Sequence, residues 1–188
     1  MEAVAERVTS GKGRQLLQAI LTARRAERVL DLKAARAAAL DLLARKAWSR
    51  RDLTARLRRR GAPADVVGAV VSELESRGYL DDAQFARRWV ETRAGSRRLG
   101  PARLRSELRA RGVDAELAEA AIREAFGRES EASLALAAGR KRLPVLEKRD
   151  PGRAPVRLSD YLLRRGYPGG VVAQVVRTLC KLGDAGPE

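Results

Sequence analysis

Three stretches of this chain align with one another, and each is centred on a glycine: Gly61, Gly112 or Gly166. A leucine stands eight residues before each glycine, another stands four residues before it, and an arginine directly precedes it. The leucines of the three copies are Leu53 and Leu57, Leu104 and Leu108, and Leu158 and Leu162. Apolar pairs also recur at equal distances after each glycine. The chain therefore contains a threefold repeat with a period of about 50 residues.

Each copy of the repeat has the pattern of a helix, a glycine and a second helix. The apolar residues on both sides of the glycine recur at helical spacing, and glycine suits the left-handed position that ends a helix. Pro101 and Pro155 stand where a central helix would begin, and Ser49 with Asp52 resembles a helix cap. A further helical segment precedes each pair, at 35–47, 82–94 and 129–142. The sequence predicts an all-α protein, an elongated array of three tandem three-helix (helix-turn-helix-like) repeats.

The repeat also predicts the domain organisation. We expect three-helix units at 34–78, 79–127 and 128–182. Residues 1–33 are expected to form a partly helical leading segment, and residues 183–188 a flexible tail. The stretch "RDPGRAP" at 149–155 is expected to be a loop, with Pro144 weakening the end of the helix before it.

Two adjacent aspartates, Asp81 and Asp82, stand between the first and second units. Gly78 is placed to end one helix, and Asp81 to cap the next, with Gln84 able to reach back. Asp82 would favour the positive end of the helix dipole. We interpret this stretch as a structural joint between units rather than as a metal site, which would need more oxygen ligands nearby. The joint residues are Gly78, Leu80, Asp81, Gln84 and Phe85.

The positive charge is concentrated once per unit. The formal net charge is +15, and the windows 41–60, 87–111 and 140–165 carry net charges of +6, +7 and +6. These windows lead into and along the central helices, whose arginines should face outward because the leucines face inward. The candidate binding residues are Arg51, Arg58, Arg59, Arg98, Arg103, Arg105, Arg109 and Arg164. The pattern predicts a long anionic partner, nucleic acid or an assembly that carries it, although a solvated helix face or a GC-rich genome would also give many arginines.

Several functional classes are disfavoured by what the sequence lacks. It contains no histidine, the commonest general base and metal ligand, and no GxxxxGK[ST] phosphate loop. A single cysteine, Cys180, excludes an internal disulfide and a Cys-rich zinc site. We therefore expect no enzymatic activity, no catalytic residues, no metal and no cofactor. The apolar runs are too short to span a bilayer, so a soluble cytoplasmic protein is expected, without a membrane partner.

Three motifs resemble the RecX family, regulators of the RecA recombinase: "SRRDLTARLRRRG", "RGYLDDAQFARRWV" and "GPARLRSELRARGV", in this order. The resemblance covers residues 35–182, and the third unit matches it more loosely. It implies tandem three-helix units that bind along the groove of the RecA–DNA filament and impede strand exchange, ATP hydrolysis and LexA cleavage. Recombination, DNA repair and the SOS response are the processes it implies. The implied partners are the RecA filament and DNA, single-stranded within the filament and weakly as duplex, and we expect a monomer.

The residues alone leave an alternative open, a direct DNA-binding protein of helix-turn-helix type that acts without RecA. Acidic residues on the third helices of the first two units disfavour those helices as major-groove readers. They are Asp65, Glu73, Glu75, Asp114, Glu116 and Glu119. A purely structural scaffold is a third class.

Overall fold

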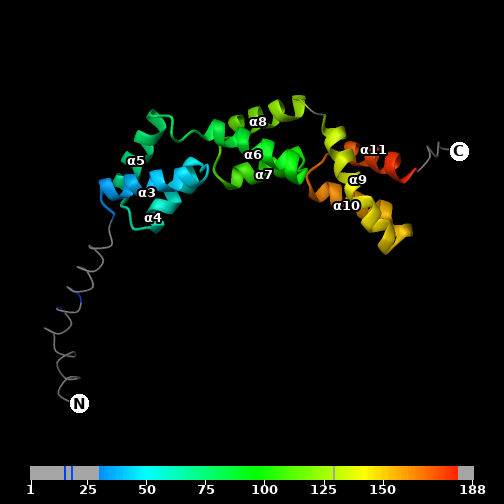
Figure 1. The fold of residues 1–188 in the computed structure, drawn as a ribbon, viewed down its shortest axis with the longest axis horizontal. Helices are drawn as coiled ribbons and strands as arrows, with labels where there is room; N and C mark the ends of the chain where they lie inside the picture. Colours follow the sequence, from blue (N-terminus) through cyan, green and yellow to red (C-terminus); the bar gives the residue numbers. More distant parts are fainter. Residues whose placement is uncertain (1–14, 16–17, 19–29, 129, 182–188) are drawn as a thin grey trace, which may run out of the picture. The chain divides into compact units, whose positions relative to one another are not determined.

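The computed structural model describes residues 15, 18, 30–128 and 130–181. Within 30–128 and 130–181 the chain forms nine α-helices and one short 3-10 helix, and these residues contain no strand (Figure 1). The prediction of an all-α array of three-helix repeats is confirmed. The leading segment lies almost entirely outside the described residues, as does the tail at 183–188. The helices are α3 (Leu32–Arg45), α4 (Arg50–Arg59), α5 (Ala64–Ser76), α6 (Asp82–Arg97), α7 (Pro101–Ala110), α8 (Ala115–Arg128), α9 (Glu131–Arg149), η1 (Pro151–Arg153), α10 (Ala154–Arg164) and α11 (Gly169–Cys180).

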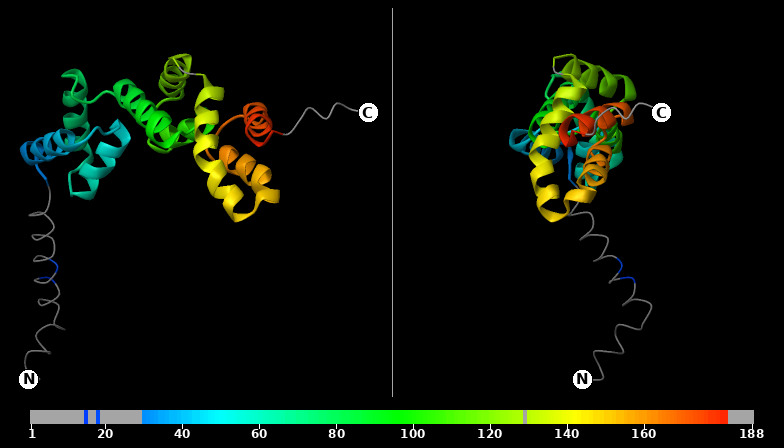
Figure 2. Two further views of the ribbon diagram at one scale, coloured as in Figure 1. Left: turned by 45° about the vertical axis from the view of Figure 1, so that its right-hand side comes forward. Right: turned by 90° about the vertical axis from the view of Figure 1, so that its right-hand side faces the viewer.

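The described helices belong to two compact units. The first unit contains α3, α5 and the part of α4 from residue 53 onward, and the second contains residues 48–52 and everything from residue 80. Within the second unit, α6 and α7 pack on α8, while α10 and α11 pack on α9. Figure 2 shows this last group, with α9 lying against α10 and α11.

The repeat leucines are core residues in all three repeats, and those of the second and third repeats belong to one continuous core. All six are completely buried: Leu53, Leu57, Leu104, Leu108, Leu158 and Leu162. Burial of a leucine side chain stabilises a fold by roughly 1.5–3 kcal/mol. The periodicity of the sequence is therefore the periodicity of the core, and arginines next to these leucines, such as Arg58, Arg103 and Arg109, are exposed.

Each repeat glycine ends a central helix in the left-handed conformation, with φ of 93° at Gly61, 71° at Gly112 and 88° at Gly166. The N–H of the following residue donates to the carbonyl of the second repeat leucine, as Val113 does to Leu108 at 3.2 Å. This is a Schellman motif, and it confirms the predicted helix-ending role of the glycines.

Asp81 is the N-cap of α6. Its Oδ1 accepts hydrogen bonds from the backbone N–H of Ala83 at 2.8 Å and of Gln84 at 3.0 Å. The capping prediction is confirmed. The neighbouring Asp82 has a different task, because its carboxylate accepts from the backbone N–H of Arg50, the first residue of α4, at 2.8 Å. The two aspartates thus satisfy the first N–H groups of two different helices.

Replacing Asp81 by alanine is expected to lower the free energy of unfolding by about 0.5–2 kcal/mol, because two backbone donors lose their acceptor. Asp81→Asn is the matched control and should lose much less, since asparagine caps helices about as well as aspartate. Urea unfolding of the three proteins checks this. An equal loss for both variants would show that the charge of Asp81 acts rather than its capping.

The structure corrects the expectation for residues 142–155. α9 does not weaken at Pro144 but continues to Arg149, and the segment expected to be a loop is η1 followed by the start of α10. Leu143 and Leu146, on either side of the proline in α9, are both buried. Their burial offsets the cost of about 3 kcal/mol of a proline inside a helix.

Candidate functional site

The predicted outward face of the central helices carries most of the candidate arginines. Six of the eight are exposed, whereas Arg98 and Arg105 are half-buried. The six are Arg51, Arg58, Arg59, Arg103, Arg109 and Arg164. Arg58 and Arg59 belong to the first compact unit and the others to the second. Their role in binding stays a prediction.

Arg98 has a structural task at the end of α6. It is the C-cap residue in the left-handed conformation, with φ of 49°. Its backbone carbonyl accepts a hydrogen bond from the hydroxyl of Tyr167 at 3.0 Å. This bond ties the end of α6 to the segment after α10, and it involves only the backbone of Arg98.

Arg105 forms an ion pair that connects α7 to α8. Its guanidinium donates to both carboxylate oxygens of Glu119, with Nη2 at 3.0 Å from Oε2. This side-chain hydrogen bond lowers the pKa of Glu119 and raises the pKa of Arg105. Arg105, which was expected to face outward on the flank of its helix, is half-buried, because a carboxylate of the next helix holds it. Arg103 lies 3.4 Å from Glu107 within α7 but remains exposed.

Trp89 is the centre of a cluster that sequence reasoning did not assemble. The guanidinium carbons of Arg93 and Arg111 lie 3.4 and 3.8 Å from the centroid of its ring. Glu107 accepts hydrogen bonds from Nε1 of Trp89 at 3.1 Å and from Nε of Arg93 at 2.9 Å. Asp52 accepts from Arg111 at 2.6 Å. Because each of these two arginines has a carboxylate partner, the cluster is a structural network rather than a free anion site.

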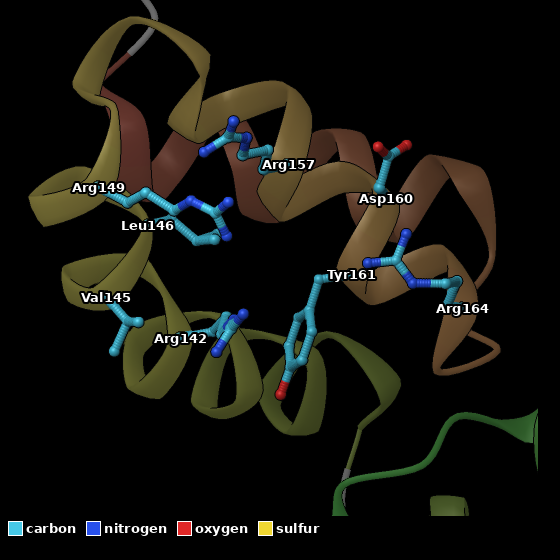
Figure 3. Close-up of a pocket in the computed structure, with 8 residues that line it drawn as sticks. All are labelled: Arg142, Val145, Leu146, Arg149, Arg157, Asp160, Tyr161 and Arg164. Carbon is cyan, nitrogen blue, oxygen red and sulfur yellow. The ribbon is translucent and has the colours of Figure 1, made fainter.

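A second basic region surrounds Tyr161 in the third repeat. A hollow of about 220 Å³ between α9 and α10 is lined by four arginines, Arg142, Arg149, Arg157 and Arg164 (Figure 3). Of these, only Arg164 was on the list of candidates from the sequence. The sequence carried one signal for them. Arg142 and Arg149 stand seven residues apart, as do Arg157 and Arg164, and residues at this spacing lie on one face of a helix.

Metal binding and thiol chemistry are the other possibilities to consider for the described residues. No group of histidine, cysteine, aspartate or glutamate side chains among them could hold a metal ion. Burial raises the pKa of the Cys180 thiol, which favours the protonated, unreactive form. None of the described helices is long and apolar enough to cross a membrane.

The pKa of Asp82 is raised, chiefly by burial and against the effect of the hydrogen bond from Arg50. The folded protein then holds this proton more tightly than the unfolded chain does, so this group's contribution to stability falls as pH rises through its folded-state pKa. We therefore compare Asp82→Asn with wild type at the same pH. The free energy of unfolding of the variant, relative to that of wild type, should increase as the pH rises through the folded-state pKa of Asp82. Urea unfolding from about pH 3 to about pH 7 checks this, and a pH-independent difference would contradict the assignment.

Comparison with known families gives two matches. Residues 35–74 match the family model described as RecX, first three-helix domain, and residues 81–122 match RecX, second three-helix domain. The chain is 43% identical over 146 residues to regulatory protein RecX of Thermus thermophilus, covering 78% of this chain and 92% of that protein. It is 37% identical over 145 residues to regulatory protein RecX of Amycolatopsis mediterranei, covering 77% and 82%.

Solved structures show the same fold. The crystal structure of RecX from Lactobacillus salivarius has a TM-score of 0.69 at 16% identity, with 80% of this chain and 97% of that chain covered. A second crystal structure, of a regulatory protein RecX, has a TM-score of 0.70 at 22% identity, with 85% and 76% covered.

Proposed function

This chain belongs to the RecX family of regulatory proteins, and we propose that it regulates RecA by binding the RecA–DNA filament. The observation that carries this proposal is the repetition of exposed arginines beside the buried leucines of successive central helices. A filament is a periodic, anionic surface, and a tandem array of basic units matches it. Binding would impede strand exchange, ATP hydrolysis and LexA cleavage by RecA.

In this proposal the protein acts by occupying its site on the RecA–DNA filament, and it catalyses no reaction of its own. Candidate contacts are Arg51, Arg58, Arg59, Arg103, Arg109 and Arg164, with Arg98 at the end of α6. We propose that it works as a monomer in the cytoplasm. Electrostatic contacts of this kind give fast association and a strong dependence on salt.

The test is the single-strand-DNA-dependent ATP hydrolysis of RecA, measured while this protein is added. We expect hydrolysis to fall at or below one protein per RecA monomer, and the protein alone to hydrolyse nothing. Unchanged RecA turnover, together with tight and sequence-selective binding to free duplex, would instead support a direct DNA-binding protein of helix-turn-helix type.

A further inference from the structure

The hollow between α9 and α10 adjoins a second one of about 500 Å³, and the two share Arg142, Val145 and Tyr161. The second hollow adds basic side chains from α9 and from the ends of α6 and α10, namely Arg97, Arg98, Lys141 and Arg165. We call the two hollows together the arginine groove. It lies entirely within the second compact unit.

The arginine groove is strongly unbalanced in charge. Eight basic side chains line it, and Asp160 is the one carboxylate among the lining residues. Asp150 lies outside the lining, 3.8 Å from Arg157. The Trp89 cluster is different, because there each guanidinium that covers the ring has a carboxylate partner. Converging guanidinium groups repel one another, and an anionic ligand would relieve that repulsion.

Arg157 provides the most specific sign of a missing acceptor. Its Nη1 is buried and has no hydrogen-bond partner among the described residues. Arg157 comes from α10, and Figure 3 shows it with Arg149 of α9 at the same hollow. Buried donors in proteins are nearly always paired, so an unpaired one needs an explanation. A ligand oxygen in the groove could supply the acceptor once the Arg157 side chain turns toward it, because Nη1 itself is buried.

Tyr161 brings an aromatic ring into the same groove. The guanidinium carbons of Arg165 and Arg142 lie 4.6 and 5.6 Å from the centroid of its ring. These cation–π contacts position two arginines that otherwise repel each other. An aromatic side chain inside a basic groove is typical of proteins that bind single-stranded nucleic acid.

We propose that the arginine groove binds the phosphodiester backbone of single-stranded DNA. Seven of its eight basic side chains are arginines, whose planar guanidinium groups match phosphate oxygens in two-point hydrogen bonds. The basic groups line a recess between packed helices, which a flexible single strand can enter and a stiff duplex cannot. The aromatic ring favours a polynucleotide over an acidic protein segment. This inference deepens the proposed function, on which its relevance to the RecA–DNA filament rests, by giving the DNA contact a site that includes Arg98 and Arg164.

The test measures the fluorescence anisotropy of a labelled oligothymidylate with the full-length protein over a range of salt concentrations. The groove variant is Arg149→Glu with Arg157→Glu. The matched control is Arg140→Glu with Arg177→Glu, which makes the same charge change at two exposed residues of the same repeat that do not line the groove. We expect the groove variant to lose at least about tenfold more affinity than the control. Its log–log salt slope should be shallower than that of wild type by roughly 1.4, or about 0.7 for each lost phosphate contact.

Each other outcome overturns the inference. Equal losses in the two variants would show only diffuse attraction, and equal affinity for duplex would exclude a single-strand recess. If the groove variant binds the oligothymidylate normally but fails to inhibit RecA, the groove binds an acidic protein surface. Circular dichroism controls for folding. If the double variant does not fold, Arg164→Gln, a milder change at an exposed lining residue, replaces it. Arg164→Gln should weaken binding of the oligothymidylate, and unchanged affinity would overturn the proposal.

Discussion

Replacing Gly166 by alanine is expected to destabilise the second compact unit by about 2–5 kcal/mol, the sum of a left-handed alanine and a local overpacking. Gly166 has φ of 88°, and a Cβ there would meet the backbone nitrogen of Arg103 and lie 2.7 Å from its Cβ. The start of α7 and the end of α10 are joined there by backbone hydrogen bonds. Gly100 donates to the carbonyl of Arg165 at 2.7 Å, and Ala102 donates to that of Gly166 at 3.2 Å.

Gly170→Ala is the matched control for this variant. Gly170 lies in the first turn of α11, and a Cβ added there would have no atom within 4 Å. The free energy of unfolding of Gly170→Ala should therefore equal that of wild type or exceed it by less than about 1 kcal/mol. Gly112→Ala should fall between the two. The nearest atoms to its Cβ belong to the side chain of Arg51 instead of to backbone, but the Cβ of Arg51, at 2.7 Å, cannot move by side-chain rotation. Urea unfolding measures the free energy of unfolding of the three variants. Wild-type stability in Gly166→Ala would contradict the backbone contact between α7 and α10.

Reversing Arg103 and Arg109 to glutamate together is expected to weaken inhibition of RecA by about tenfold or more, since repulsion replaces attraction at two exposed positions of α7. The fold should survive. Exposed substitutions usually change stability by no more than about 0.5 kcal/mol, and loss of the 3.4 Å pair between exposed Arg103 and half-buried Glu107 adds about 1 kcal/mol. Arg105 is left unchanged, because its guanidinium donates to both carboxylate oxygens of Glu119 and so connects α7 to α8.

The control for this variant is Arg87→Glu with Arg88→Glu, the same charge change on the exposed face of α6. The concentration that halves RecA ATP hydrolysis is measured for each protein. If the α7 variant is stably folded and inhibits as well as wild type, the binding face lies elsewhere. If the α6 variant loses as much, only the net charge of the protein matters.

The features that local chemistry determines were predictable from the sequence. The repeat leucines, the left-handed glycines and the Asp81 cap all depend on spacing within one helix or turn. Features that depend on packing between helices were not. α9 continues through Pro144 because buried leucines stabilise it, and Glu119 of α8 holds Arg105 of α7.

The arginine groove illustrates the same limit for the candidate site. Arg142 and Arg149 were counted in the basic window 140–165, but nothing in their own helix indicates which residues face them. Only the packing of α10 on α9 brings Arg157, Arg164 and Tyr161 to the same hollow. The number of arginines was therefore predictable, and their convergence was not.

Binding of this protein to the assembled filament tests the central claim most directly. The N-terminally labelled protein is titrated with RecA–single-stranded-DNA filaments held by a slowly hydrolysed ATP analogue, and in parallel with the same DNA without RecA and with RecA without DNA. We predict saturable binding that is at least about tenfold tighter to the filament than to either component. Equal affinity for the bare DNA and the filament would contradict a RecA-directed regulator.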